Sequence, residues 1–415
     1  MRNRPISRVQ KISVAITFCF LPLQSIVAWQ YSPITPTESS VSVKGRPNDV
    51  PTRKAFESFY NSDYDSAIQG FQAAQEAHPD DPFAANHLLE AVLVREIDRE
   101  GALNAELYLR SEFLHTKKAL VDEQVRNRIE DLAKQALYLS TERLKEKPDD
   151  TDALYARGVT RSLYALYEGF VEKAWYSAFR NALGAYDDHK RVLELTPSYS
   201  DANLVVGVYE YIVAGLPVYE RVVAFMLSIK GSKAEGMGAI RQAADAGGGA
   251  SVDAKTALSL FLARERLYPE ALSLMSELYR SYPHNFHFGF SQAGLFRSSG
   301  NIPEAVTAYR NLLDLGQRQI FPHPRLTRAA YALGETLRFQ GDYRAAADAY
   351  ESVAKLPGAD REQVAKTKLL AGEMYDLLQE RDAAIRKYHE AITLSSDSTE
   401  IREAKRLLNH PYHNP

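Results

Sequence analysis

Two short stretches combine residue types that act as nucleophiles in other proteins. The segment GFSQA holds Gly289, Ser291 and Ala293, the outline of a sharp turn that exposes a serine. The segment SVAK places Ser352 three residues before Lys355, a serine–lysine spacing used in acyl transfer. The surrounding pattern predicts helices at both places, and neither Ser-Asp-Asn nor Lys-Thr-Gly occurs anywhere in the chain. We therefore expect no nucleophilic serine, and no enzyme.

The histidines and glycine clusters also suggest no cofactor. His284 and His287 have a spacing that metal ligands use, but no carboxylate stands where a helical zinc motif needs one. His323 stands alone in FPHPR. The glycines of AGGGAS are not followed by the Gly-Lys-Ser/Thr order of a phosphate loop, so they are expected to end a helix. The sequence predicts no metal and no cofactor.

Cysteine and charge exclude further classes of site and partner. Cys19 is the sole cysteine, so residues 29–415 can form neither a disulfide nor a thiolate metal site. The formal net charge is −3, and it becomes about −7 once the four basic residues of the first 28 positions are removed. Nucleic-acid binding depends on clustered Lys and Arg, and no such block is present.

The first 28 residues have the layout of a secretory signal peptide. A basic head with Arg2, Arg4, Arg8 and Lys11 precedes an apolar run that ends at the small residue Ala28. An uncleaved N-terminal anchor is the alternative. Residues 29–52 are rich in Pro, Ser and Thr and read as a tether. We expect a periplasmic or secreted protein, with membrane contact beyond this leader only as a less favoured alternative.

The elements that must position any site are helices. Beyond residue 52, apolar residues recur at three- and four-residue spacing, and no run alternates as a strand does. The pattern also repeats along the chain. One copy is YALGETLRFQGDYRAAADAYESVAKLP, residues 331–357, and AGEMYDLLQERDAAIRKYHEAITL follows it in register.

These copies resemble the tetratricopeptide repeat, a helical hairpin of about 34 residues. Leu333 and Gly334 match its first helix, and Ala346 and Tyr350 match its second. In the second copy Ala384 and Tyr388 take these places, and further copies centre on Ala67, Ala271 and Ala305. The resemblance implies an all-α solenoid of antiparallel hairpins, in which small residues let helices approach and aromatic residues fill the gaps. Ala136, Ala185 and Gly236 are 49 and 51 residues apart, which predicts two enlarged central units.

The predicted organisation follows from this register. After the leader (1–28) and the tether (29–52), hairpins with aromatic and apolar inserts occupy residues 53–250. A regular array occupies 251–397, and a polar capping helix with a tail occupies 398–415, as open-ended arrays need for solubility.

The most apolar run of the chain outside the leader is residues 204–231, which begins in the first helix of one enlarged hairpin and continues into an insert before the second helix. Residues 216–229 form an insert that begins near Pro217, a residue suited to the first turn of a helix. Its apolar residues surround most of a helix, so something must cover it. They include Tyr219, Val222, Phe225 and Met226. A wedge among neighbouring repeats is preferred; a ligand or partner groove and a membrane-surface contact are the alternatives.

Residues 204–243 around this insert also resemble the inclusion-body clearance proteins, a eukaryotic family with tetratricopeptide repeats. The matching residues are Leu216, Pro217, Gly231, Gly236 and Gly238. This resemblance concerns architecture and implies no function.

A partner is expected in the concave groove that first helices line in such arrays. The register assigns a set of aromatic, charged and histidine residues to groove positions, residue types that dominate interface energetics. They are Tyr155, Tyr211, His287, Phe290, Arg297, Arg328, Tyr331, Glu335 and Arg338.

The sequence thus predicts a non-enzymatic scaffold that binds a protein or peptide outside the cytoplasm. The alternative is a small-ligand or lipid-binding protein, or an enzyme, that uses the aromatic centre of residues 164–229. Trp175, Tyr176, Tyr209 and Tyr219 belong to that centre.

Overall fold

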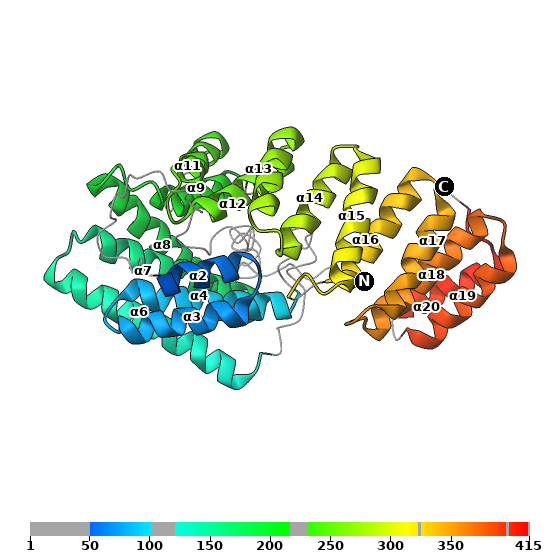
Figure 1. Cartoon of the computed structure of the whole chain (residues 1–415), viewed down its shortest axis with the longest axis horizontal. Coiled ribbons are helices and arrows are strands. Elements are labelled where there is room, and N and C mark those ends of the chain that lie inside the picture. Colours follow the sequence, from blue (N-terminus) through cyan, green and yellow to red (C-terminus); the bar gives the residue numbers. More distant parts are fainter. Residues whose placement is uncertain (1–49, 102–120, 216–230, 323–324, 396–397, 414–415) are drawn as a thin grey trace, which may run out of the picture. The chain divides into compact units, whose positions relative to one another are not determined.

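The computed structural model describes residues 50–101, 121–215, 231–322, 325–395 and 398–413 (Figure 1). Within these residues the fold is all-α, with seventeen α-helices, two short helices of other types and no strand. None of the described helices is both long and apolar enough to cross a membrane.

The helices follow one another as antiparallel pairs. Contacts join α2 to α3, α4 to α6, α7 to α8, α9 to α11, α14 to α15, α16 to α17 and α18 to α19. The bounds in the first half are α2 Val50–Tyr60, α3 Tyr64–Ala77, α4 Pro82–Arg99, α6 Glu123–Glu146, α7 Thr151–Leu166, η3 Tyr167–Val171, α8 Trp175–Leu195, α9 Ala202–Ala214 and α11 Lys233–Asp245. Those in the second half are α12 Ser251–Arg264, α13 Tyr268–Ser281, α14 Phe286–Ser298, α15 Ile302–Gln317, α16 Leu326–Gln340, α17 Tyr343–Ser352, η4 Val353–Lys355, α18 Arg361–Leu377, α19 Arg381–Leu394 and α20 Ser398–Asn409.

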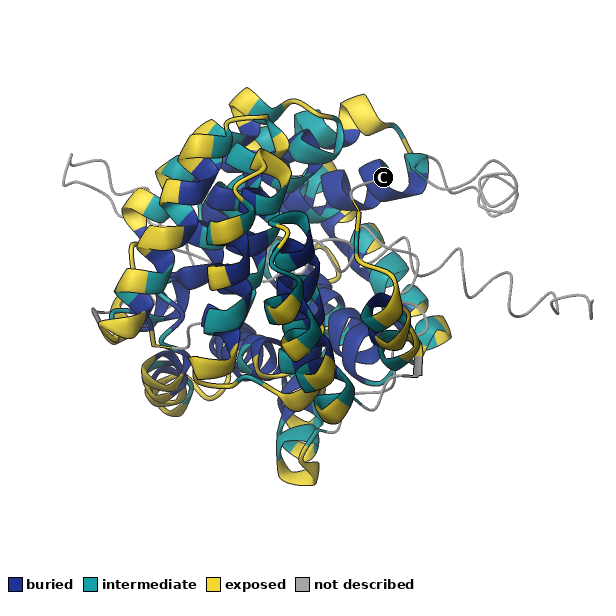
Figure 2. Cartoon of the chain, turned by 90° about the vertical axis from the view of Figure 1, so that its right-hand side faces the viewer, coloured by how far each residue is buried: buried dark blue, intermediate teal, exposed yellow. Residues whose placement is uncertain are grey.

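Small residues bring the two helices of each hairpin together. Ala346 and Ala384 are completely buried. A Cβ added at Gly334 would lie 2.5 Å from the Tyr350 ring, and one at Gly372 would lie 2.5 Å from the Tyr388 ring. Each glycine therefore makes room for an aromatic ring on the second helix. Many helices are buried along one face and exposed along the other, as Figure 2 shows, because an amphipathic helix packs one face on its neighbours. Helices α4 and α12 are instead buried on nearly every side.

Polar residues define where the hairpin helices begin and end. The carboxylates of Asp150, Asp342 and Asp360 accept hydrogen bonds from backbone N–H groups in the first turns of α7, α17 and α18. Gly341 ends α16 in the left-handed conformation, with φ of 87°.

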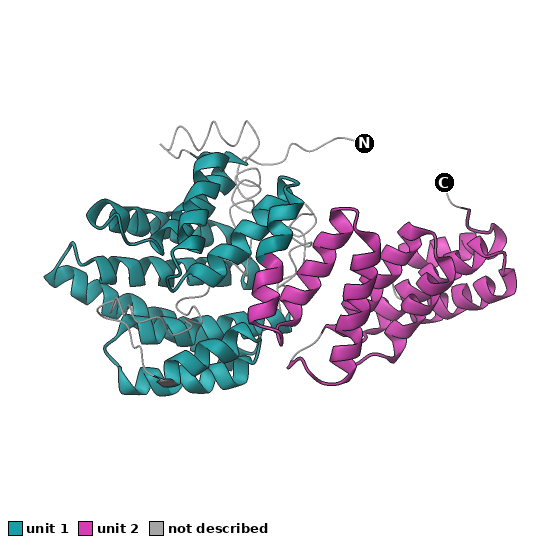
Figure 3. Cartoon of the chain, turned by 45° about the horizontal axis from the view of Figure 1, so that its top comes forward, with its two compact units in different colours: residues 1–274 teal, residues 275–415 magenta. Residues whose placement is uncertain are grey.

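The chain divides into two compact units, residues 1–274 and 275–415 (Figure 3). In unit 1 the hydroxyl of Tyr60 on α2 donates to Asp253 Oδ2 on α12 at 3.2 Å, so the first hairpin meets a helix 193 residues further along. The boundary between the two units falls inside α13. The sequence instead predicts that the regular array begins at residue 251.

Several details depart from the sequence-based boundaries. Helix α2 begins at Val50, so the last three residues assigned to the tether are helical. The first residues of the aromatic insert form the π-helix η3, which directly follows α7. Helix α8 then begins at Trp175. The apolar insert lies outside the described residues, together with Pro217, Tyr219, Val222, Phe225 and Met226.

Candidate partner-binding surface

In unit 1, the two tyrosines assigned to the groove are core residues. Tyr155 is fully buried, with its ring 4.5 Å from that of Tyr199. Tyr211 is also buried; its ring stacks on Phe261 at 3.9 Å, and its hydroxyl donates to Glu265 Oε1 at 2.7 Å. These side chains hold helices together in this structure and face no open surface.

Helix α14 in unit 2 divides its predicted groove residues between core and surface. His287 is buried. Phe290 is half-buried and packs on Phe286 at 5.8 Å and on Tyr309 at 5.6 Å. Arg297, in the last turn, is half-exposed. The contribution of α14 to a binding surface is therefore small.

Polar and aromatic side chains of α16 and α18 meet in a group called here the first-helix surface of unit 2. From α16 it takes the four residues expected from the sequence, all of them half-exposed: Arg328, Tyr331, Glu335 and Arg338. From α18 it takes the exposed Lys366 and, at its buried edge, Glu373; neither was predicted from the sequence. These lie 38 residues after Arg328 and Glu335, the same interval that separates Ala346 from Ala384. Extending the repeat register by one unit would have found them.

Two contacts join the helices across this surface. The Lys366 ammonium lies over the Tyr331 ring, 4.9 Å from its centroid. Arg338 Nη1 lies 3.3 Å from Glu373 Oε2. Below the surface, the buried Tyr350 hydroxyl donates to Glu335 Oε1 at 2.5 Å and fixes that carboxylate. The surface therefore presents oriented charges, and its aromatic ring is already paired with a cation.

Glu373 has unusual acid–base behaviour. Burial raises its pKa to about 7; the nearby charges of Glu403 and Glu335 act in the same direction, whereas Arg338 and Arg406 oppose the rise. A carboxyl group with this pKa changes charge near neutral pH, so the charge beside Arg338 depends on pH.

The chain itself returns to this surface after α20. The Tyr412 hydroxyl accepts a hydrogen bond from Arg338 Nη2 at 2.7 Å, and the Arg338 guanidinium lies 5.5 Å from the centre of the Tyr412 ring. The Tyr412 backbone N–H donates to Asp376 Oδ2 at 2.8 Å. Arg381 donates to the carbonyls of Leu407 and Leu408 at the end of α20, which fixes where this segment starts.

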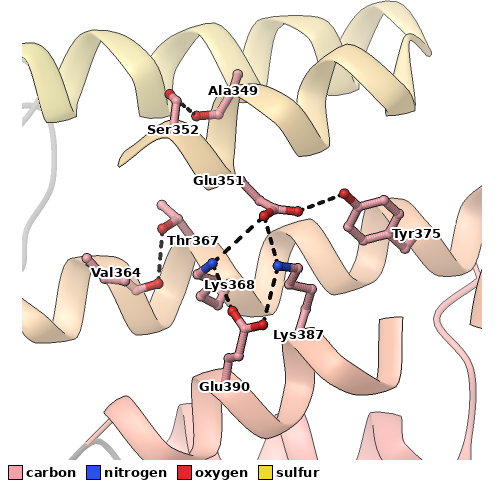
Figure 4. Close-up of polar contacts among 9 residues, drawn as sticks. All are labelled: Ala349, Glu351, Ser352, Val364, Thr367, Lys368, Tyr375, Lys387 and Glu390. Atoms are coloured by element: carbon pink, nitrogen blue, oxygen red, sulfur yellow. Dashed lines mark hydrogen bonds and ion pairs between the residues drawn. The ribbon is translucent and has the colours of Figure 1, made fainter. Parts of the chain in front are cut away.

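A second charged cluster in unit 2 ties together three helices (Figure 4). Glu351 of α17 accepts from Lys387 of α19 at 2.8 Å and from the Tyr375 hydroxyl of α18 at 2.7 Å. Glu390 of α19 lies 2.8 Å from Lys368 of α18 and 3.3 Å from Lys387. Two acids and two bases thus balance one another, which is the composition of a structural network.

The residues named for the aromatic centre differ in burial. Tyr209 is buried and stacks on Tyr186 at 4.2 Å, whereas Tyr176 is 74% exposed. Tyr219 lies outside the described residues.

Helix α4 of unit 1 carries a buried acid. Glu90 on α4 is 1% exposed, and neither carboxyl oxygen has a hydrogen-bond partner among the described residues. Burial, with a smaller contribution from Asp253, raises its pKa well above the ordinary value and so favours the neutral form. In the described parts of the chain, no three His, Cys, Asp or Glu side chains gather as a metal site would need.

Comparison with known proteins gives one family match. Residues 291–356 match the family model described as tetratricopeptide repeat. No curated protein matches the chain.

Among solved structures, Pseudomonas aeruginosa pilF is similar, with 18% identity, a TM-score of 0.37 and coverage of 63% of this chain and 99% of that chain. Yeast Tom70 has 15% identity, a TM-score of 0.34 and coverage of 86% and 87%. YrrB, a tetratricopeptide-repeat protein with an unusual peptide-binding site, has 14% identity, a TM-score of 0.32 and coverage of 65% and 98%.

The family match over residues 291–356 agrees with hairpins in which small and aromatic positions repeat in register. Residues 291–356 therefore match the tetratricopeptide repeat, within a chain whose described residues form an all-α fold.

Proposed function

We propose that the protein is a non-enzymatic scaffold that holds an extended segment of a protein partner on the first-helix surface of unit 2. The observation that carries the proposal is the grouping of Tyr331, Arg338 and Lys366 on two successive first helices, α16 and α18, which are joined by side-chain contacts. Tetratricopeptide arrays expose extended surfaces built from first helices, and aromatic and arginine side chains contribute most to binding energy.

An exposed aromatic residue adds to this surface. Phe339 is 78% exposed, and it follows Tyr331 and Glu335 at four-residue intervals on α16. Residues at this spacing lie on neighbouring parts of one helix face. A large apolar side chain that the fold leaves in water is available to a partner.

The direct test is affinity capture followed by cross-linking, with residues 29–415 as bait and envelope or secreted proteins as prey. The test variant is Tyr331→Ala/Phe339→Ala/Lys366→Ala. The matched control is Tyr138→Ala/Tyr176→Ala/Lys405→Ala, which also removes two aromatic residues and one lysine, all at exposed positions elsewhere.

We expect a partner that the wild-type chain and the control capture and the test variant loses, with cross-links that map to α16 or α18. Circular dichroism melts must agree among the three proteins. If the test variant retains the same partners, the first-helix surface is not the binding site.

We further propose that the scaffold works in the periplasm or as a secreted protein. The basic and apolar leader of residues 1–28 supports this location, as does the absence of cysteine from residues 29–415. Mass spectrometry of the fractionated protein should find a chain that begins at Trp29 outside the cytoplasm. A chain that retains Met1 in the membrane fraction would instead support an uncleaved anchor.

A further inference from the structure

The segment after α20 lies on the surface proposed to bind a partner, and it contacts that surface through both its backbone and a side chain. Tyr412 donates its backbone N–H to Asp376 and accepts from Arg338 through its hydroxyl, at 2.8 Å and 2.7 Å. Tyr412 is separated from these two residues by 36 and 74 positions, so this is a tertiary contact. It resembles the way an extended peptide binds a protein: one backbone bond gives orientation, and one side chain gives specificity.

Contacts that do not involve Tyr412 fix both receptor groups. Arg381 Nη1 lies 2.8 Å from Asp376 Oδ1, and the Tyr388 hydroxyl donates to Asp376 Oδ2 at 2.7 Å. The Asp376 side chain is only 1% exposed. Glu373 orients Arg338 from the same helix that carries Asp376. A carboxylate oxygen and a guanidinium therefore remain positioned if Tyr412 leaves, which is the preorganisation that favours binding.

The contacts select for a tyrosine in an extended chain. The guanidinium lies 5.5 Å from the ring centroid, which favours an aromatic ring, and it also donates to the hydroxyl, which distinguishes tyrosine from phenylalanine. Pro411 fixes its own φ and disfavours a helical conformation at His410, so the chain leaves α20 extended.

We propose that Arg338 and Asp376 form a recognition site for a tyrosine within an extended peptide, and that Tyr412 of the same chain occupies this site until a partner displaces it. The inference rests on the proposed function, since it assigns the partner a chemical feature and places its binding on the same surface. A segment tethered beside its site has an effective concentration of about 1 mM, so it competes strongly with a weak peptide.

The probe is a fluorescent peptide of residues 408–413, Leu-Asn-His-Pro-Tyr-His, titrated by anisotropy against the full-length chain. We expect it to bind the Tyr412→Ala chain at least about tenfold more tightly than the wild-type chain, because the substitution vacates the site. The Tyr412→Phe chain should be intermediate, since it keeps the ring and loses the hydroxyl. A peptide with alanine in place of tyrosine should not bind, and Arg338→Ala in the Tyr412→Ala background should abolish binding.

Three outcomes would overturn the proposal. The first is equal affinity of the peptide for wild-type and Tyr412→Ala chains whose melting curves agree. The second is equal binding of the tyrosine and alanine peptides. The third is a wild-type dimer in light scattering that Tyr412→Ala makes monomeric, because the site would then receive the segment of a second copy.

The test separates this inference from the proposed function. If the captured partner depends on Tyr331, Phe339 and Lys366 while the peptide results are negative, tyrosine recognition alone is wrong. If the peptide results are positive while the triple variant keeps every partner, the site binds only the chain's own Tyr412 segment. The partner of the scaffold would then bind elsewhere than on the first-helix surface.

Discussion

The ring of Tyr350 occupies the space that a side chain on Gly334 would need, because a Cβ at Gly334 would lie 2.5 Å from ring carbon Cε1. The Tyr350 hydroxyl also reaches Glu335, the residue next to that glycine, so the ring cannot shift without losing this bond. We expect Gly334→Ala to lower the free energy of unfolding by roughly 1–3 kcal/mol, measured by urea denaturation.

Gly238 is the matched control for this substitution. It lies inside helix α11 with nothing within 4 Å of an added Cβ. Gly238→Ala should stabilise the protein by about 0.5–1 kcal/mol, because alanine is the better helix former where space is open. Equal destabilisation by both substitutions would contradict the role given to the close approach.

Glu373 should make stability depend on pH between its ordinary value of 4.5 and about 7. The folded state holds the proton more tightly than the unfolded state, so stability falls as pH rises through this window and is constant above it. Glu373→Gln should remove roughly 1–3 kcal/mol of this pH dependence. The measurement is the urea midpoint of the wild type and of the variant from pH 4.5 to 8. If the two midpoints differ by the same amount at every pH, the prediction is contradicted.

The network around Glu351 should contribute to stability with the opposite pH dependence. Lys387 and Tyr375 hold the ionised form, which lowers the pKa of Glu351 although burial opposes the shift. Its contribution is therefore present above the ordinary value and is lost as pH falls below it. Glu351→Gln should cost about 1–2 kcal/mol at pH 7, because Lys368 and Lys387 are mostly buried and lose an acidic partner. The exposed pair Lys145–Glu142 is the control, and Glu142→Gln should leave the urea midpoint unchanged.

At neutral pH, the protein with glutamine at position 90 should be more stable than the wild type with Glu90. Burial favours the protonated form of this carboxyl group in the folded state, whereas the unfolded chain ionises it above its ordinary pKa. Glu90→Gln should raise the melting temperature at pH 8 and have little effect at pH 4. Glu90→Leu should add stability at both values, since an unsatisfied buried polar group costs about 1–3 kcal/mol. Destabilisation by both substitutions at pH 8 would show that the carboxyl group has a partner.

The sequence predicts the helical hairpins well because repetition removes ambiguity. Gly334 and Gly372 each precede a tyrosine at the same interval on the second helix, and the structure places both rings against those glycines. The same register also predicts the α16 residues of the first-helix surface. Lys366 and Glu373 are predictable too, provided that the register is carried into α18.

The register is less informative in unit 1, because helices there are covered on more than one side. Tyr155 and Tyr211 occupy groove positions in the repeat pattern, yet both are buried against aromatic rings. A repeat pattern specifies which face of a helix a residue lies on, and the path of the whole chain determines what covers that face. The return of Tyr412 to Arg338 has the same origin: nothing local in either segment specifies a contact across 74 residues.

The hydrogen bond between Tyr60 and Asp253 has a consequence for how unit 1 opens. Arrays in which each hairpin contacts only its neighbours lose structure progressively from a free end. A bond from α2 to α12 joins hairpins that are far apart in the series, so unit 1 has no free first hairpin. Amide hydrogen exchange should therefore show similar protection from α2 through α12, with the unit opening as one cooperative block.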